Sequence, residues 1–267
     1  MPQRLSTFKK YLKLAGGLLF VPKCPGCGEV MPLSTVTDRE GVLCDRCLDK
    51  WYQEKLTCCK GCGKSYPQCM CPTDALLEAG CGVLISLVPY DKNARTSRNV
   101  VSKLIYEIKD TKNRALTDFL AFELASALEF VIRRLGAANC VVTYAPRSNK
   151  AINEKGHDQS YLLAGAFASL LELPFAKCFR RVSRLFGERT QKELDESERI
   201  LNARRSYSFN PKRAQFVKDK CVILIDDLVT TGASLAACTD LLVKNGAQSI
   251  ICVTVAASIA EKEEKEK

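Results

Sequence analysis

The sequence predicts an α/β protein, in which a small cysteine-rich module precedes a doubly wound and mostly parallel sheet. Three observations lead to this prediction. From residue 82 onward, short apolar runs alternate with helix-like segments, the order that places parallel strands between two layers of helices. One of these runs, at 221–225, is followed by two aspartates and by a turn rich in threonine and glycine. Cysteines crowd residues 24–81, many of them in closely spaced pairs.

The composition is that of an ordinary soluble protein, with 46% hydrophobic and 26% charged residues. The length of 267 residues suits one large domain, or one medium domain with a small module. A formal net charge of +10 favours anionic partners such as phosphates, nucleotides or nucleic acid. No run approaches the ~20 apolar residues of a membrane span. The scattered cysteines after residue 81 have apolar neighbours, as in a reducing compartment, so we expect a cytoplasmic protein without membrane contact.

Residues 1–22 predict a short amphipathic segment that packs on the module after it. Leu5, Phe8 and Leu12 recur at helical spacing. A signal peptide is the alternative, because basic residues precede the apolar run LAGGLLFV. That run is short and no small-residue cleavage site follows it, which favours the amphipathic segment.

Residues 23–75 predict a zinc-ribbon module with one or two sites. Two Cys-x-x-Cys pairs separated by sixteen residues have the spacing of a structural four-cysteine zinc site. A second pattern follows with a tighter last pair, and Cys58 is an alternative to Cys59 there. Disulfides are the competing interpretation, and the absence of an export signal argues against them. The predicted ligands are Cys24, Cys27, Cys44 and Cys47 in the first site, and Cys59, Cys62, Cys69 and Cys71 in the second.

The cysteine-rich module has few apolar residues of its own. The segment around Trp51 and Tyr52 is too polar to form a separate core. We therefore expect Zn²⁺ to supply much of the folding free energy of this module.

The sequence pattern predicts that residues 80–258 form the α/β domain. It predicts that residues 259–267 form a charged tail exposed to solvent. The polar stretch 183–219 has the length of a functional lid. Because ligands of parallel sheets bind beyond the carboxyl ends of the strands, we expect the ends at Pro146, Val182 and Asp226 to converge. Strands are expected at 82–88, 140–146, 175–182, 221–225 and 249–257, and helices at 97–109, 115–135, 162–170 and 233–247.

The stretch 221–234, CVILIDDLVTTGAS, combines features that suit a ribose with a 5′-phosphate. Ionised carboxylates only accept hydrogen bonds, so Asp226 and Asp227 suit sugar hydroxyls. Gly232 lets the backbone come close to a ligand, and the N-terminus of the following helix favours a phosphate. One alternative is an acidic pair that only caps a helix. Another is the strand end of a P-loop ATPase, whose Gly-x-x-x-x-Gly-Lys-Ser/Thr loop does not occur in this sequence.

The same stretch resembles the PRPP (phosphoribosyl pyrophosphate) loop of type I phosphoribosyltransferases, in which Asp-Asp and Thr-Thr-Gly follow an apolar strand. The resemblance implies that Asp226 and Asp227 hold the ribose 2′ and 3′ hydroxyls as the catalytic pair. It also implies Mg²⁺ on the diphosphate of PRPP and a closing hood at 183–219. The implied 5′-phosphate loop is Thr230, Thr231, Gly232, Ala233 and Ser234, and the implied pyrophosphate loop is Pro146, Arg147 and Ser148.

Over nearly its whole length the chain resembles the ComF-type proteins, a cysteine-rich zinc module fused to a phosphoribosyltransferase domain. Members of that family tend to carry Arg-Gly-Phe-Asn-Gln after the pyrophosphate turn, where this chain has Lys155-Gly-His-Asp-Gln159. The elements Thr190-Gln191, Arg199-x-x-Asn202 and Tyr207 also fit the family pattern. The family's link with DNA uptake in competent bacteria implies a partner in DNA processing.

Two functions follow from these expectations. The first is a phosphoribosyltransferase that moves phosphoribose from PRPP to an unknown acceptor. The second is a non-catalytic, nucleotide-sensing adaptor whose zinc module contacts single-stranded DNA or a DNA-processing protein. His157 is the only histidine, and a structural role is the first expectation for it, with acid–base chemistry as the alternative.

Overall fold

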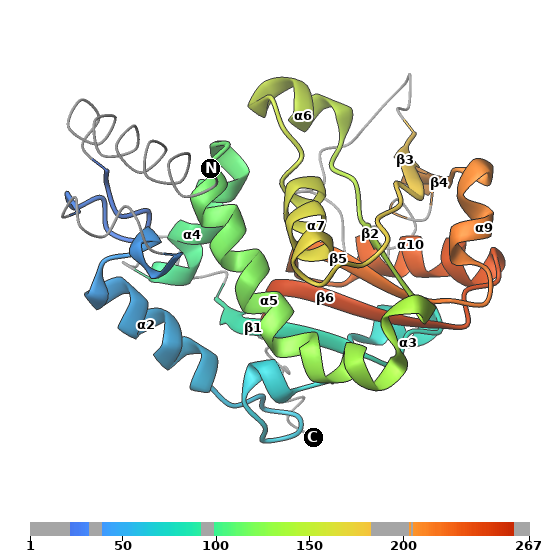
Figure 1. The fold of residues 1–267 in the computed structure, drawn as a ribbon, viewed down its shortest axis with the longest axis horizontal. Coiled ribbons are helices and arrows are strands. Elements are labelled where there is room, and N and C mark those ends of the chain that lie inside the picture. Colours follow the sequence, from blue (N-terminus) through green and yellow to red (C-terminus); the bar gives the residue numbers. More distant parts are fainter. Residues whose placement is uncertain (1–21, 32–38, 92–98, 183–202, 204, 259–267) are drawn as a thin grey trace, which may run out of the picture.

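Four parallel strands form the central sheet, in the order β1-β6-β5-β2 (Figure 1). The computed structural model describes residues 22–31, 39–91, 99–182, 203 and 205–258. Every neighbouring pair of strands in this sheet is parallel. Four of the five predicted strands therefore belong to one parallel sheet, as expected. Their bounds are β1 Leu84–Tyr90, β2 Cys140–Tyr144, β5 Cys221–Val229 and β6 Ser249–Ser258.

Side chains of β5 alternate between two apolar cores, one on each face of the sheet. Ile223 and Ile225 pack in the core that includes α4 (Val100–Asp110), α5 (Arg114–Leu135) and α7 (Gln159–Leu170). Val222 and Leu224 pack in the other core, with α3 (Asp74–Glu78) and α10 (Ala233–Lys244). Helices thus cover both faces, which confirms the doubly wound architecture.

The helices begin and end where local chemistry favours it. Asn99 and Asn113 cap α4 and α5 by accepting hydrogen bonds from the backbone of Val101 (2.7 Å) and Leu116 (3.1 Å). Gly136 ends α5 with a φ of +82°. Shorter elements are α6 Asn149–Lys155, α9 Ala214–Val217, and the 3₁₀ turns η2 Arg39–Val42, η3 Tyr66–Gln68, η5 Ala137–Asn139 and η6 Pro211–Arg213.

The strand expected at 175–182 is not part of the parallel sheet. Instead, β3 (Phe179–Arg181) pairs antiparallel with β4 (Tyr207–Phe209) in a separate two-stranded sheet. Phe179 and Phe209 pack edge to face with their ring centroids 6.1 Å apart, which favours this pairing. The start of the expected strand meets the central sheet through an isolated bridge between Phe175 and Val142 of β2. The expectation that this strand belongs to the parallel sheet is therefore wrong, whereas the convergence of its end at Val182 with the other two strand ends stays a prediction.

Several predictions fall outside the described residues. These are nearly all of the amphipathic segment 1–22, residues 183–202 and 204 of the expected hood, and the tail 259–267. The domain limits at 23–75 and 80–258 stay predictions.

The cysteine-rich module packs directly on the α/β domain. Trp51, on α2 (Asp45–Leu56), is fully buried, and its ring meets Phe119 of α5 edge to face at a centroid distance of 6.0 Å. The indole Nε1 of Trp51 donates to Oε2 of Glu123 at 3.0 Å, and Nζ of Lys55 lies 2.6 Å from the same oxygen. The few apolar side chains of the module therefore contribute to the core under α4 and α5.

We expect Glu123→Ala to lower the free energy of unfolding by about 1.5–3 kcal/mol, because Trp51 and Lys55 lose a charged acceptor in a buried place. Urea titration followed by circular dichroism measures this. Glu129→Ala is the matched control on the same helix, since Glu129 forms an exposed i,i+4 pair with Arg133 and should change stability by less than about 0.5 kcal/mol. Equal losses in the two variants would contradict a special role of Glu123.

The outer edge of the sheet at β1 is covered by the cysteine-rich module. The backbone N–H of Leu84 donates to the carbonyl of Met70 at 3.3 Å, next to η3. The module thus reaches the sheet at its edge as well as at α5. Among the helices that the structure describes, none has the length and apolarity needed to cross a membrane.

Candidate functional site

The acidic pair lies at the carboxyl end of the central sheet, inside β5. The sequence predicts a strand that stops at Ile225, but β5 continues to Val229. β5 continues to pair with β6 beyond Ile225, with Asp226 opposite Thr254 and Val229 opposite Ala257. This is possible because β6 is ten residues long and supplies backbone partners up to that point. The two carboxylates are therefore held by sheet backbone rather than by a loop.

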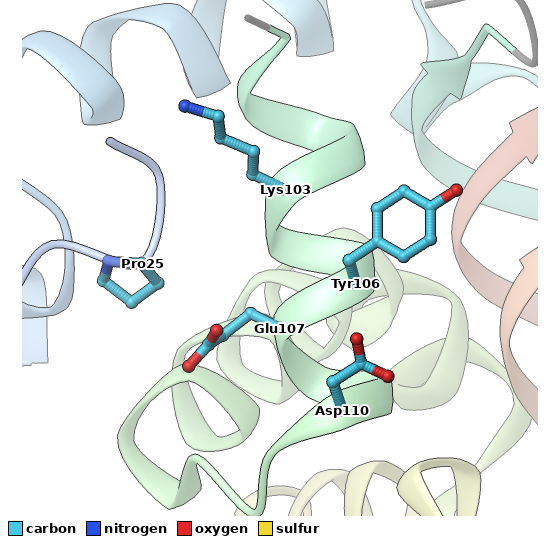
Figure 2. Close-up of a pocket in the computed structure, with 5 residues that line it drawn as sticks. All are labelled: Pro25, Lys103, Tyr106, Glu107 and Asp110. Atoms are coloured by element: carbon cyan, nitrogen blue, oxygen red, sulfur yellow. The ribbon is translucent and has the colours of Figure 1, made fainter. Parts of the chain in front are cut away.

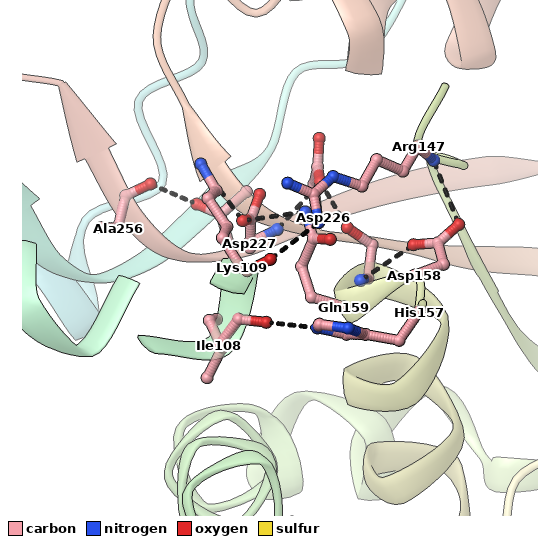
Figure 3. Close-up of polar contacts among 11 residues, drawn as sticks. Ile108, Lys109, Arg147, His157, Asp158, Gln159, Asp226, Asp227 and Ala256 are labelled. Atoms are coloured by element: carbon pink, nitrogen blue, oxygen red, sulfur yellow. Dashed lines mark hydrogen bonds and ion pairs between the residues drawn. The ribbon is translucent and has the colours of Figure 1, made fainter. Parts of the chain in front are cut away.

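Each carboxylate of the pair has its own hydrogen-bond partners (Figure 3). Oδ1 of Asp226 accepts from Oγ of Ser160 at 2.8 Å and from the backbone N–H of Asp227 at 2.9 Å. Oδ2 of the buried Asp227 accepts from Nε2 of Gln159 at 3.1 Å and lies 3.3 Å from Nζ of Lys109. The N-terminus of α7 thus contacts both carboxylates, and the C-terminus of α4 contacts Asp227.

The basic turn predicted as a pyrophosphate loop lies beside the acidic pair. The backbone of Ala145 donates to the carbonyl of Ile225 at 3.0 Å, so the turn leaves β2 next to Asp226. The backbone N–H of Arg147 donates to Asp158 at 3.1 Å, and its guanidinium donates to the carbonyl of Lys109 at 2.9 Å (Figure 3). Pro146 is buried, and Ser148 caps α6 through Ala151. The structure therefore brings the predicted turn 146–148 and the acidic pair together.

The turn 230–234 connects β5 to α10. Gly232 is the N-cap residue of α10 with a φ of +82°, a left-handed conformation that side chains disfavour. Oγ1 of Thr231 accepts from the backbone N–H of Ala233 at 3.4 Å. Thr230 is exposed, while Thr231 and Ser234 are half-buried. The turn therefore presents the N-terminus of a twelve-residue helix at the same sheet end as the acidic pair.

His157 is a buried link between segments, which fits its expected structural role. Its Nδ1 lies 2.9 Å from the carbonyl oxygen of Lys155, and its Nε2 lies 2.9 Å from that of Ile108. Both ring nitrogens are occupied by main-chain oxygens, so neither faces the acidic pair. The ring holds the start of α7 against the end of α4, the helix that carries Lys109.

One polar atom of the site has no partner within the described part of the chain. Oε1 of Gln159 is buried and accepts no hydrogen bond there, although Nε2 of the same side chain binds Asp227. A buried acceptor without a partner is costly, so a donor from a ligand or a water molecule would stabilise it.

Burial raises the pKa of Asp226 from its ordinary value of 3.8 to about 8, and the negative charge of Asp227 adds to the shift. Because the pKa of Asp226 is higher in the folded than in the unfolded state, protonation of this carboxyl stabilises the fold. This contribution is complete below about pH 4 and is lost as the pH rises to about 8.

We therefore expect Asp226→Asn to become progressively more stable than the native sequence as the pH rises from about 4 to about 8, since asparagine carries no charge to bury. Urea titrations of both proteins at four pH values measure the difference. A difference that stays constant over this range would contradict the raised pKa.

The first cysteine cluster joins a tight turn to a helix start. The sulfur atoms of Cys24, Cys27, Cys44 and Cys47 all lie within 4.8 Å of one another. Gly28 has a φ of +79°, and its N–H donates to the carbonyl of Cys24 at 2.7 Å. The backbone N–H of Cys44 donates to Sγ of Cys24 at 3.3 Å, as suits a thiolate. This is the predicted ligand set.

The second cluster repeats the turn of the first. The sulfur atoms of Cys59, Cys62, Cys69 and Cys71 lie within 4.8 Å of one another. Gly63 has a φ of +71° and donates to the carbonyl of Cys59 at 2.9 Å, as Gly28 does to Cys24. Although burial raises it, hydrogen bonds from the backbone of Cys62 and Gly61 lower the pKa of the Cys59 thiol to about 7. Both clusters therefore fit a metal that takes four sulfur ligands.

The choice between Cys58 and Cys59 is settled by the turn. Cys58 forms a β-bridge with Ser65. In the first turn the equivalent bridge joins Lys23 to Val30, so Cys58 is equivalent to Lys23 and not to a ligand. Cys58 is exposed and belongs to neither cluster. All fifteen cysteines lie in described residues and are free thiols, so the disulfide interpretation finds no support in the structure.

A shallow pocket of about 220 Å³ lies between the first turn and α4. It is lined by Pro25, Lys103, Tyr106, Glu107 and Asp110 (Figure 2). Its carboxylates already have partners, because Glu107 accepts from Thr111 at 3.0 Å and Asp110 pairs with Lys155 at 2.8 Å. The acidic pair of β5 is therefore the stronger candidate for a ligand site.

Three side chains of the site are not among the predicted site residues. Lys109, Gln159 and Ser160 bind the acidic pair directly. Gln159 is the last residue of the Lys-Gly-His-Asp-Gln segment. That segment is the sequence feature from which a contribution of the start of α7 to the site could have been predicted. Lys109 gives no local signal, since it is one of two lysines on the amphipathic α4.

Comparison with known protein families finds a match in the C-terminal part of the chain. Residues 157–267 match the family model described as phosphoribosyl transferase domain. No curated protein matches the chain.

Three solved structures show partial likeness to the chain. The allosteric regulatory enzyme of purine biosynthesis is 16% identical, with a TM-score of 0.34, and the alignment covers 56% of this chain and 30% of that one. An adenine phosphoribosyltransferase is 17% identical, with a TM-score of 0.34 and coverage of 56% and 82%. The adenine phosphoribosyltransferase of Thermoanaerobacter pseudethanolicus is 16% identical, with a TM-score of 0.27 and coverage of 51% and 83%. The chain thus spans under a third of the first of these proteins.

Proposed function

We propose that the chain binds PRPP, or a nucleotide with a ribose 5-phosphate, and transfers phosphoribose to an acceptor. One observation carries the proposal: the acidic pair, the turn 146–148 and the N-terminus of α10 meet at one end of a parallel sheet. The family match at 157–267 supports it, because that segment includes the acidic pair and the turn 230–234. The chain's resemblance to ComF-type proteins is consistent with this proposal.

The proposed chemistry breaks the bond between ribose C1 and the diphosphate while a nucleophile of the acceptor bonds to C1. Asp227 and the ionised form of Asp226, which predominates above about pH 8, accept hydrogen bonds from the ribose hydroxyls and so fix the sugar ring. The N-terminus of α10 and the hydroxyls of 230–234 hold the 5′-phosphate. Lys109 and Arg147 are cations next to the acidic pair, and they balance negative charge on the departing diphosphate.

Metals have two separate roles in this proposal. Zn²⁺ is structural, since two sets of four cysteine sulfurs suit its tetrahedral preference at Zn–S distances of about 2.3 Å. Mg²⁺ prefers oxygen ligands, and the carboxylates of Asp226 and Asp227 lie where the ribose and diphosphate would supply more. Bound on the diphosphate, Mg²⁺ would neutralise part of its charge.

The direct test is calorimetry with PRPP and Mg²⁺, combined with an assay of pyrophosphate release over a panel of bases and amines. We expect saturable PRPP binding and release with at least one acceptor. A properly folded protein that binds neither PRPP nor ribose 5-phosphate would refute the proposal.

The adaptor alternative uses the same pocket without turnover. PRPP binding without pyrophosphate release across a broad panel would favour it. Single-stranded DNA as a partner follows from the net charge of +10 and the resemblance alone. Filter binding at about 50 mM and 200 mM salt tests it, because phosphate contacts weaken steeply over that range.

A further inference from the structure

A very short piece of chain joins the second cysteine cluster to Thr73, a residue that contacts Gly232 of the turn 230–234. Cys71 is a member of the cluster, and Thr73 is the N-cap residue of α3. Oγ1 of Thr73 accepts from the backbone N–H of Leu76 at 3.4 Å, which fixes the direction of its side chain. Between them lies Pro72, whose ring restricts the backbone.

Thr73 lies directly on Gly232. A Cβ atom placed on Gly232 would overlap Oγ1 of Thr73, and would lie 3.3 Å and 3.5 Å from its Cβ and Cγ2. The side chain of Thr73 therefore takes the space that any larger residue at position 232 would need. Two independent features therefore require glycine at position 232: the contact with Thr73 and the φ of +82°.

Both ends of this connection are anchored. On one side, the fully buried Leu76 and its neighbours on α3 pack in the same core as Leu235 and Leu242 of α10. On the other side, the carbonyl of Met70 accepts from Leu84 of β1, and Cys69 is buried. A shift of the cluster would thus be transmitted to Thr73 rather than absorbed by a loose linker.

We propose that Thr73 is a positioning residue for the phosphate loop, and that a metal on Cys59, Cys62, Cys69 and Cys71 fixes it in place. The proposal rests on the proposed function, because it assigns the turn 230–234 to a 5′-phosphate. A loop held in its binding conformation loses less conformational freedom when the phosphate binds, so the metal-loaded cluster raises affinity. The first cluster instead faces α4, since its Gly26 packs on Val100 of that helix.

The first experiment is calorimetry with ribose 5-phosphate on three variants. Thr73→Ala removes both the cap and the contact with Gly232, and we expect affinity to fall about tenfold. Thr73→Ser keeps the hydroxyl and should restore affinity to near the native value. Thr117→Ala is the control, because the Thr117 hydroxyl donates to Asn113 at the start of α5, away from the turn. Native affinity in Thr73→Ala would overturn the proposal.

The second experiment tests the link to the metal. Cys71→Ser, with its zinc content measured, should weaken ribose 5-phosphate binding as Thr73→Ala does. The double variant should be no weaker than either single one, because both act through the same contact. Losses that multiply in the double variant would show independent effects and overturn the link.

Amide hydrogen exchange at Gly232 and Ala233 measures the positioning itself. We expect faster exchange in Thr73→Ala and in Cys71→Ser than in the native protein, with or without ligand. If the native protein binds neither ribose 5-phosphate nor PRPP, the proposed function fails, while exchange still decides whether Thr73 positions the turn. Unchanged exchange in both variants would overturn the inference even in a protein that binds PRPP.

Discussion

Chelation of the metal should expose Trp51 and make residues 23–72 sensitive to protease, while the rest of the chain stays folded. Structural zinc supplies about 10–16 kcal/mol in small zinc modules, which is more than this segment gains from its few apolar side chains. Cys44 is the N-cap residue of α2, and Cys47 lies in its first turn. Loss of their metal therefore frees the start of the helix that carries Trp51.

The fluorescence of Trp51 reports this event directly, because it is the only tryptophan. Its indole is fully buried against Phe119 and Glu123, so release into water should shift the emission to longer wavelength. Cys44→Ser should give the same shift without chelator, together with the loss of one zinc atom per chain in mass spectrometry.

Cys58→Ser is the matched control for the cysteine variants. It removes one exposed thiol next to a predicted ligand but outside both clusters, so emission, zinc content and protease resistance should not change. A metal-free protein with buried Trp51 and a protease-resistant module would refute the zinc assignment.

Replacing both aspartates of the acidic pair by asparagine should abolish measurable PRPP binding. At a pH above about 8, where Asp226 is also ionised, each charged acceptor contributes about 1.5–3 kcal/mol, so the double change should weaken affinity about a hundredfold or more. The two introduced amides would also carry donors toward the ribose hydroxyls, where ionised carboxylates only accept. Calorimetry with PRPP and Mg²⁺ measures the loss, and circular dichroism checks the fold.

The control for this experiment removes a negative charge elsewhere. Asp118 is an exposed residue of α5 that pairs with Arg114 at a distance of 3.7 Å. Asp118→Asn should leave PRPP affinity unchanged. Unaltered affinity in the Asp226→Asn, Asp227→Asn double variant would show that the ribose lies elsewhere.

The sequence predicts most of the fold because its strands and helices carry strong local patterns. The run at 221–225 is buried on both faces, and the apolar residues of 97–109 lie on one side of α4, as their spacing indicates. The segment at 175–182 has equally good strand residues, but its pairing depends on β4, a strand near residue 207 that the local pattern does not reveal. Strand existence is a local property, whereas the choice of partner is not.

The site divides in the same way. Residues 226–234 can be recognised in the sequence as a candidate site, because ribose and phosphate chemistry needs particular side chains in consecutive order. Gln159 reaches Asp227 from 68 positions away, and Lys109 from still further along the chain, so only the folded structure identifies them as partners. The choice of Cys59 over Cys58 likewise depends on which residue the turn directs toward the other sulfurs.

The hydrogen bond between Leu84 and Met70 has a consequence for solubility. β1 is one of the two outer strands of the central sheet, and an uncovered outer strand offers unpaired N–H and C=O groups to any other extended chain. Here the segment beside η3, held between members of the second cluster, covers the start of that strand. We therefore expect a protein whose second cluster carries no metal to expose this sheet margin and to self-associate more readily.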